Sequence, residues 1–401
     1  MTGVEVDQLD ARTTRRSRVA AAALFLTNGA LFANLAPRLP EIKTDLALSN
    51  TAYGIVVAAF PAGALAAGLA AGALIRRFTS ARAAVLGTLG IASMIVVAAA
   101  APAPVLVAVA LFLGGACDAV TDVAQNTQGL RVQRRYGRSI INSLHAIWSV
   151  GAVIGSAMAA GAIATGIPRQ VHLAVTAVVF TTVAAVAFRF LLRGRDVTAD
   201  EEADAAAVGG GRSPRIYVAV ALLVLIAVAG ALVEDAGSSW ATLYLGGDLG
   251  AAGAIAVLGY IALLAFQFLG RLVGDRLVDR FGERAVVRTG GFVTAAGMGL
   301  ALAFPSVPGT IAGFAAAGIG IATAIPAAMH AADRLPGLRP GAGLTAVAWL
   351  MRVGFVAAPP VVGAVADATS LRVGLLVVPL AGLVVFASAG VLSRRHPPAR
   401  S

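Results

Sequence analysis

The sequence predicts an all-α integral membrane protein with 12 transmembrane helices in two pseudo-symmetric six-helix bundles. Hydrophobic residues make up 58% of the 401 residues and charged residues only 13%, whereas a soluble domain has about 25% charged residues. Apolar runs of about 20 residues recur along almost the whole chain, and each is long enough to cross about 30 Å of hydrocarbon as a helix. Two charge-rich stretches at equivalent places in the two halves indicate an internal repeat.

The apolar runs define the helices in order. The first six are predicted at about 18–36, 51–75, 83–101, 104–129, 140–163 and 171–192. The second six are predicted at about 216–245, 252–273, 284–304, 308–331, 341–366 and 371–393. The bundles are therefore 18–195 and 216–393, with a polar linker at 196–215 and tails at 1–17 and 394–401.

Basic residues gather in alternate loops, which predicts the orientation in the membrane. With both termini in the cytoplasm, 26 of the 31 lysines and arginines lie on cytoplasmic segments or their edges, and Arg352 lies within a helix. The remaining four, Arg38, Lys43, Arg169 and Arg372, lie outside. The positive-inside rule thus predicts a multi-pass protein of the cytoplasmic membrane with both termini, the linker and both tails cytoplasmic. The net charge of +11 reflects this topology, so we expect no nucleic-acid partner.

The charge-dense stretch 274–288 is predicted to be a tight cytoplasmic turn between two membrane helices, in which Gly282 can take the positive φ that ends a helix. It resembles the signature loop of the major facilitator superfamily, G-x-x-x-D-R-x-G-x-[RK]. The matching residues are Asp279, Arg280, Phe281, Gly282 and Arg284. The counterpart at 76–82 keeps the basic residues, but Arg76 stands at the position of the acid and Thr79 at that of the glycine.

This resemblance implies secondary transport by alternating access, in which two bundles rock about a central site. It also implies a cytoplasmic latch, broken when the cavity opens inward, for which we expect Arg77, Asp279, Arg280, Gly282 and Arg284. Because Arg76 replaces the acid in the first half, the latch should be lopsided. We expect a monomer in the lipid bilayer that binds a small-molecule substrate and needs no cofactor and no metal.

Polar side chains on the predicted fourth helix are the main candidates for a substrate or proton pathway. Asp118, Asp122 and Asn126 follow one another at four-residue spacing and so share one helix face. A carboxylate in mid-membrane costs roughly 2.5–3.5 kcal/mol, so two on one stripe must face water, a partner or a ligand. Asn28 is the polar residue near the middle of the first helix. Alternatively, Asp122 and Asn126 only contact loop arginines such as Arg131.

Three further residues are candidates for the same pathway, and each has a second interpretation. Glu234, beside Asp235 on the seventh helix, is either a proton-coupling group or an outer-gate residue. Arg352 forms either a structural ion pair to Asp118 or Glu234, or a clamp for an anionic or hydroxyl-rich substrate. His145 on the fifth helix either shuttles protons or is a hydrogen-bonded structural group.

Segments 122–126, 137–138, 145–151 and 234–240 resemble the fucose-permease-like branch of the superfamily. In sugar symporters of that kind, acids on helices 1 and 4 carry proton coupling and substrate contact. Only the fourth-helix acids carry over, because the first helix offers only Asn28. The resemblance favours proton-coupled symport of a sugar or organic acid.

The alternative is a proton-driven drug or metabolite exporter. Exporters of that type carry a Gly-Pro step on helix 5, whereas this chain has Gly151 and Gly155 without the proline. Enzyme function is not expected, because none of the four histidines has H-E-x-x-H spacing. The single cysteine, Cys117, excludes an intrachain disulfide.

Overall fold

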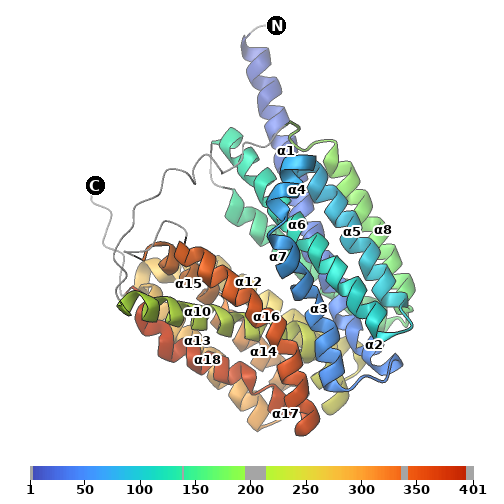
Figure 1. Cartoon of the computed structure of the whole chain (residues 1–401), viewed down its shortest axis with the longest axis vertical. Coiled ribbons are helices and arrows are strands. Elements are labelled where there is room, and N and C mark those ends of the chain that lie inside the picture. The colour runs from blue at the N-terminus through green and yellow to red at the C-terminus, as the bar shows by residue number, and fades with distance from the viewer. Residues whose placement is uncertain (1–2, 138–139, 195–213, 336–341, 394–401) are drawn as a thin grey trace. The chain divides into compact units, whose positions relative to one another are not determined.

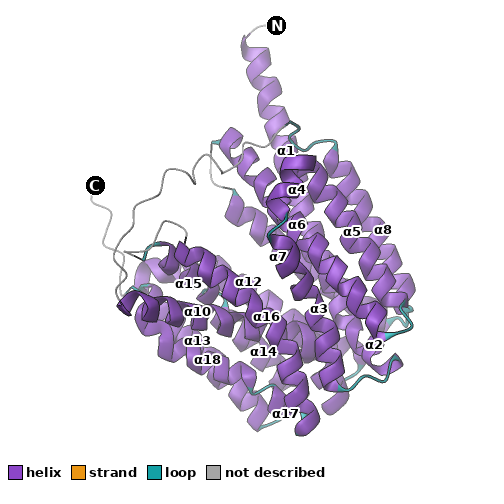
Figure 2. Ribbon diagram, viewed as in Figure 1, coloured by secondary structure: helices purple, strands orange, loops and turns teal. Residues whose placement is uncertain are grey.

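The computed structural model describes residues 3–137, 140–194, 214–335 and 342–393. Every regular element in these ranges is helical (Figure 2). Within the described ranges, twelve stretches are long and apolar enough to cross a membrane. The predicted all-helical membrane fold is therefore confirmed.

The contacts between residues divide the chain into two compact units. The first comprises Met1–Leu46 and Ala59–Thr198. Its described elements are α1 (Gly3–Leu35), η1 (Ala36–Arg38), α2 (Leu39–Asp45), the later part of α3 (Asn50–Gly68), α4 (Ala71–Phe78), α5 (Ser80–Ala100), α6 (Pro104–Tyr136), α7 (Ile141–Ala164) and α8 (Arg169–Phe188), as labelled in Figure 1.

The second unit comprises Ala47–Ala58 and Ala199–Ser401. It begins with the first turns of α3 and continues with α10 (Pro214–Asp235), the π-helix η2 (Ala236–Trp240), α11 (Ala241–Leu243), the π-helix η3 (Tyr244–Asp248) and α12 (Gly253–Phe281). It ends with α13 (Glu283–Ala303), α14 (Val307–Ile321), α15 (Ala324–Asp333), α16 (Ala342–Ala368), α17 (Leu371–Gly374), α18 (Val377–Ser388) and η4 (Ala389–Val391).

Several helices continue beyond the apolar runs that predicted them. Helix α1 begins at Gly3, so the described part of the predicted tail is helical, and its first turns project beyond the neighbouring helices (Figure 1). Helix α6 continues to Tyr136, and α12 continues to Phe281. Arginine, glutamine and glutamate are good helix formers, so a helix does not stop where the hydrocarbon does. The predicted turn at 274–288 is therefore wrong in its extent, since only Gly282 separates α12 from α13.

Three predicted helices are broken into shorter ones. The run at 51–75 becomes α3 and α4, separated by Leu69 and Ala70, the run at 308–331 becomes α14 and α15, and the run at 371–393 contains α17 and α18. Hydropathy gives no signal at any of these breaks, because the residues on both sides remain apolar. An apolar run predicts that a segment crosses the membrane but does not fix its internal geometry.

Helices α1 and α7 pack closely because glycines replace side chains at their contact. A Cβ on Gly29 would come within 2.2 Å of the Trp148 carbonyl oxygen, and one on Gly151 would come within 2.2 Å of the Leu26 carbonyl oxygen. Small residues allow this backbone approach in membrane helices. The contact fixes the distance between Asn28 on α1 and Trp148 on α7.

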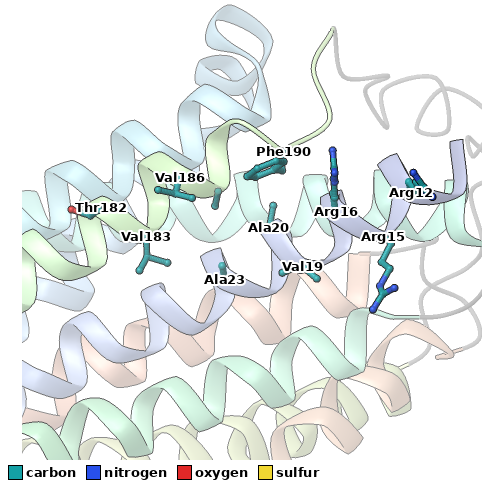
Figure 3. A pocket seen from close by; sticks show the side chains of 11 residues that line it. Arg12, Arg15, Arg16, Val19, Ala20, Ala23, Thr182, Val183, Val186 and Phe190 are labelled. Atoms are coloured by element: carbon teal, nitrogen blue, oxygen red, sulfur yellow. The ribbon is translucent and has the colours of Figure 1, made fainter. Parts of the chain in front are cut away.

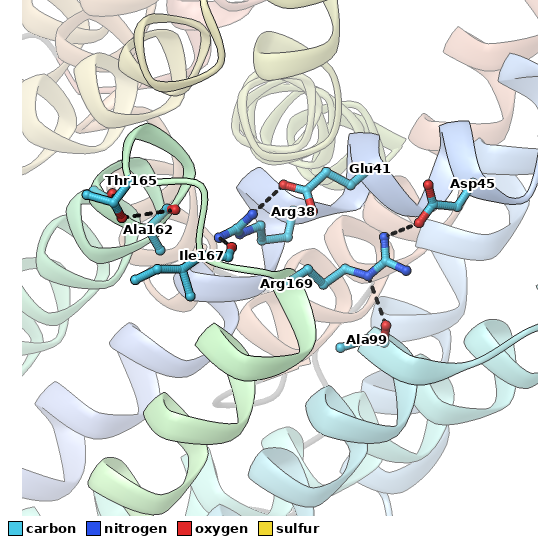
Figure 4. Close-up of polar contacts among 9 residues, drawn as sticks. Arg38, Glu41, Asp45, Ala99, Ala162, Thr165, Ile167 and Arg169 are labelled. Carbon is cyan, nitrogen blue, oxygen red and sulfur yellow. Dashed lines mark hydrogen bonds and ion pairs between the residues drawn. The ribbon is translucent and has the colours of Figure 1, made fainter.

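Arg38 and Arg169, two basic residues predicted on the outside, are buried in ion pairs at one end of the first unit (Figure 4). The Arg38 Nη1 lies 2.5 Å from Glu41 Oε1, and Nη2 donates to the Ile167 carbonyl at 2.9 Å. The Arg169 Nη1 lies 2.6 Å from Asp45 Oδ2, while its Nε donates to the carbonyl oxygen of Ala99 on α5. These contacts join α8 to α2 and α5.

Within the second unit, the carboxylate of Asp367 caps the first turn of α3. Its oxygens accept hydrogen bonds from the backbone N–H groups of Asn50 and Thr51 at 2.9 and 2.8 Å, and from Thr51 Oγ1 at 2.6 Å. The first N–H groups of a helix have no partner within it, so an acceptor there satisfies them.

Candidate functional site

Asn28, near the middle of α1, is the centre of a hydrogen-bond network in the first unit. Its Nδ2 donates to Asp118 Oδ1 on α6 at 2.7 Å, and its Oδ1 accepts from Trp148 Nε1 on α7 at 2.8 Å. Gln125 Nε2 approaches the same Oδ1 at 3.5 Å. Asn28 is only 6% exposed, so three helices that lie side by side in Figure 1 position Asp118 through one buried amide.

The hydrogen-bond partner of Asp118 is neutral, and the carboxylate of Asp122 lies one turn away on the same face of α6. Its Oδ1 accepts from the Asn28 amide, and Oδ2 has no hydrogen bond to any residue in the described ranges. The side chain is half-buried within α6, a predicted membrane span. A carboxyl group held by neutral donors can gain or lose a proton without breaking an ion pair.

A second branch of the network leads from Asp122 to His145. Asn126 Nδ2 donates to Asp122 Oδ1 at 3.1 Å, and Gln125 Nε2 lies 3.4 Å from the same oxygen. His145 Nε2 lies 3.2 Å from Asn126 Oδ1. Because the Asn126 amide nitrogen faces the Asp122 carboxylate, its oxygen faces His145, which must carry a hydrogen on Nε2 to bond it. The branch ends at an exposed imidazole, four residues from the start of α7.

The structure thus brings together Asn28, Asp118, Asp122, Asn126 and His145, all five pathway candidates of the first half. The alternative partner, Arg131, donates to the carbonyl oxygens of Leu192 at 3.3 Å and Arg193 at 2.9 Å. Trp148 and Gln125 join the network without having been site candidates. Their positions beside the polar stripes of α6 and α7 were the available signal.

Glu234 forms a polar cluster in the second unit with two residues of α12. Its Oε1 accepts a short hydrogen bond from Gln267 Nε2 and lies 3.2 Å from Arg271 Nη2. The predicted ion pair between Arg352 and Glu234 is not formed, since Arg271 occupies the place of the cation. Sequence reasoning missed Gln267 and Arg271, whose four-residue spacing on one membrane helix was a usable signal.

Asp235, next to Glu234, is buried on a different face of α10. Its Oδ1 accepts from Ser239 Oγ at 2.9 Å, and Oδ2 is buried without a partner among the described residues. Residues 236–240 form the π-helix η2, and Tyr53 Oη donates to the Ser239 carbonyl at 2.9 Å. Such π-helical turns are frequent at functional sites, so Asp235 joins Glu234 as a candidate.

Arg352 lies on an exposed stripe of α16 with Thr345 and Trp349, as the spacing predicted. Within the second unit its guanidinium has no hydrogen-bond or ion-pair partner among the described residues. Its pairing with Asp118 would join the two units and stays a prediction. The substrate-clamp interpretation also stays a prediction.

The two motif segments share one backbone geometry. Gly282 has φ 84° and ψ 152°, and Thr79 in the counterpart has φ 71° and ψ 150°. In each segment an arginine guanidinium covers the ring of the next residue: Arg280 lies 5.3 Å from the Phe281 ring centre, and Arg77 lies 5.7 Å from that of Phe78. The internal repeat is therefore visible in backbone and side chains.

The remaining latch candidates differ in their contacts within the second unit. Arg284 Nε donates to the Leu392 carbonyl oxygen at 2.9 Å, and its Nη2 makes a short bond to that of Gly390. Arg284 thus ties the start of α13 to the segment after α18. Asp279 is exposed, and no hydrogen bond or ion pair joins it to another described residue of this unit.

Comparison with known proteins supports the fold and the family. The model of the Major Facilitator Superfamily matches residues 21–276. A protein called "Uncharacterized transporter y4wD", from Sinorhizobium fredii (strain NBRC 101917 / NGR234), is 32% identical over 375 residues, which cover 93% of this chain and 97% of that protein.

Two solved structures show the same fold at low identity. The nucleoside transporter NupG is 12% identical with a TM-score of 0.71, covering 94% of this chain and 98% of that one. The Major Facilitator Superfamily transporter FucP, in its outward conformation, is 17% identical with a TM-score of 0.61, covering 93% and 97%. At these identities the likeness concerns the fold alone.

Proposed function

Since this chain belongs to the major facilitator superfamily and is a secondary transporter of the membrane, not an enzyme, we propose that it moves a small solute together with protons. Symport of a sugar or an organic acid is the favoured mode. The observation that carries the proposal is the hydrogen-bond network in which Asn28 joins Asp118 to Trp148.

Asp118 is the proposed proton-binding group. It is a carboxyl group within a membrane span, where an uncompensated charge is costly. Its hydrogen-bond partner Asn28 is neutral, and the carboxylate of Asp122 one turn away adds no compensating positive charge. Protonation of Asp118 would change which of its two oxygens accepts the hydrogen bond from the Asn28 amide. Asn28 also accepts a hydrogen bond from the Trp148 indole. A change in its bond to Asp118 therefore affects the positions of both α1 and α7. Coupling requires such a link between proton and conformation.

Substrate binding is assigned to the polar residues of α6 and α7 that belong to the same hydrogen-bond network. An indole stacks on the apolar face of a sugar ring, and amide and carboxyl groups bond its hydroxyls. Trp148, Asn126 and Asp122 supply these groups on α6 and α7. From the second unit we propose Arg352 for an anionic or hydroxyl-rich substrate and Glu234 for the coupling or gating role. Alternating access of the two bundles would connect these groups to each side of the membrane in turn.

Orientation belongs to this proposal as well. We place both termini in the cytoplasm because arginine is concentrated in the tails, the linker and the alternate loops that would share that side of the membrane. The monomeric state is proposed too.

The experiment that tests the proposal is proton movement in proteoliposomes of the purified full chain. A pH-sensitive dye is enclosed while sugars, organic acids and amphiphilic drugs are added outside. A symporter acidifies the interior when its substrate enters, whereas proton-driven export would give a drug-evoked counterflow in the other direction. The absence of proton movement with every solute tested would contradict both modes. Solute movement that does not depend on the pH gradient would contradict them as well.

Asp118→Asn tests the role of the carboxyl group with the solute found in that screen. We expect loss of proton movement, because an amide cannot be protonated, while solute exchange between equal pools persists, since exchange needs no net proton transfer. Asp333→Asn is the matched control, because Asp333 is an exposed carboxylate at the end of α15. Unchanged proton coupling in Asp118→Asn would transfer the role to Asp122, Glu234 or Asp235.

A further inference from the structure

A groove of about 730 Å³ lies between residues 12–23 of α1 and the last turns of α8 (Figure 3). One end is lined by Arg12, Arg15 and Arg16; in Figure 3 the side chains of Arg12 and Arg16 point to one side of α1 and that of Arg15 to the other. The walls further along are mainly apolar, formed by Val19, Ala20, Ala23, Val183, Val186 and Phe190. Thr182 also lines them, and its hydroxyl donates to the Val178 carbonyl oxygen within α8. The groove therefore joins a strongly basic end to a hydrocarbon-like channel.

The three arginines are available for a ligand. Each is exposed, and none has a hydrogen-bond or ion-pair partner among the side chains that the structure describes from residue 12 onward. The next basic residue of α1, Arg18, is already engaged: its Nη1 donates to Tyr136 Oη at 3.1 Å, and the guanidinium covers that ring. Ser17 Oγ donates to the Phe190 carbonyl oxygen at 2.8 Å, which holds α1 against the end of α8 beside the groove.

The length of α1 indicates that the groove lies at the expected membrane surface, where a lipid could occupy it. From Arg16 to Leu35, the end of α1, the helix rises about 28 Å, close to the thickness of the hydrocarbon layer. Arg16 therefore stands at one interface. The apolar walls run from it toward the interior of the membrane, parallel to the acyl chains of a lipid.

We propose that this groove binds an anionic phospholipid. The phosphate is held by Arg12 and Arg16, Arg15 adds positive charge at the same end, and one acyl chain follows the walls formed by Ala23, Val183 and Val186. Guanidinium groups bind phosphate bidentately, and the alkyl walls exclude water from the chain. A zwitterionic lipid carries its own cation beside the phosphate and gains less from three arginines. The site goes beyond the proposed transport function and does not depend on it.

The test is lipid retention by the full chain in native mass spectrometry. Purified protein in detergent is offered equal amounts of phosphatidylglycerol and phosphatidylcholine with identical acyl chains. We expect the wild type to retain mainly phosphatidylglycerol. Arg12→Gln/Arg15→Gln/Arg16→Gln should lose this preference, with up to about a fivefold effect for each arginine. The lysine triple variant at the same positions keeps the charge and should keep most of the preference.

The control removes three other arginines of the same unit that do not line the groove: Arg82→Gln/Arg134→Gln/Arg189→Gln. It should retain phosphatidylglycerol like the wild type. Val186→Trp fills the apolar wall without changing charge and should reduce retention, while Val97→Trp, at an exposed valine of α5, should not. The two tryptophan variants keep the proposal testable if loss of the basic residues prevents correct insertion.

Three results would overturn the lipid site. Equal retention of both lipids by the wild type would mean that the arginines do not select the headgroup. An equal loss in the control triple variant would assign the preference to surface charge in general. Thermal stabilisation by inorganic phosphate equal to that by phosphatidylglycerol would make the arginines a site for a soluble anion.

Discussion

Thr79 adopts a backbone conformation that is normal only for glycine. Its φ of 71° with ψ of 150° matches Gly282 in the second half, where no side chain opposes it. For a β-branched residue this region stores of order 1–3 kcal/mol of strain. The first half has kept the geometry of the motif and lost its glycine.

Thr79→Gly should therefore stabilise the protein by about 1 kcal/mol, the relief of strain less the added freedom of the unfolded chain. The thermal unfolding midpoint in detergent measures it. Thr165→Gly, at a helix end with φ of −91°, is the control and should lower the midpoint, since it relieves no strain. A lower midpoint for Thr79→Gly would show that the hydroxyl or methyl group of Thr79 outweighs the strain.

At the scale of the helix, the contact between α1 and α7 decides where the Asn28 network sits. A methyl group at Gly151 would clash with the Leu26 carbonyl oxygen, so Gly151→Ala must push the two helices apart. We expect a loss of stability of about 1–3 kcal/mol and weakened transport, because Trp148 moves away from Asn28. The unfolding midpoint and the rate of solute exchange measure the two effects.

Gly161→Ala on the same helix is the matched control. No atom lies within 4 Å of a Cβ at Gly161, so this change should be neutral or should stabilise α7 by up to about 1 kcal/mol through helix propensity. Equal effects of the two alanines would mean that the close approach of α1 and α7 is not needed for the site.

The sequence predicted membrane helices well and their ends poorly, for a physical reason. Hydropathy measures the free energy of transferring a segment from water into the membrane. That free energy is the same whether residues 51–75 form one helix or are divided at Leu69 into α3 and α4. The polar face of α6 was predictable because the four-residue spacing of its side chains is a local property. The pairing of Glu234 with Arg271 was not, because it depends on how α10 meets α12, which no local pattern encodes.

At the scale of the whole molecule, the two motif segments are alike in backbone and unlike in charge. Asp279 in the second half faces no described partner within its unit, whereas Arg76 stands at the equivalent place in the first half. If Asp279 contributes to the proposed latch, only the second half supplies an acidic residue at this position of the motif.

Asp279→Asn should then reduce the transport rate much more than Arg76→Ala, by about tenfold or more if the lost interaction is worth about 1.4 kcal/mol. Initial rates of solute exchange in proteoliposomes, at matched amounts of inserted protein, measure the difference. Asp275→Asn, one turn earlier on α12 and also exposed, controls for charge on that surface. Equal effects of Asp279→Asn and Arg76→Ala would contradict the lopsided latch.

The indole at the centre of the network makes the chain its own optical probe. The protein has three tryptophans, and their surroundings differ: Trp148 bonds to Asn28, Trp240 is fully buried, and Trp349 is exposed. With Trp240 and Trp349 replaced by phenylalanine, the emission spectrum would come from Trp148 alone. Emission of an indole depends on whether its N–H is bonded, so the colour of that light would follow the state of Asn28 in real time, without a label and without knowledge of the solute.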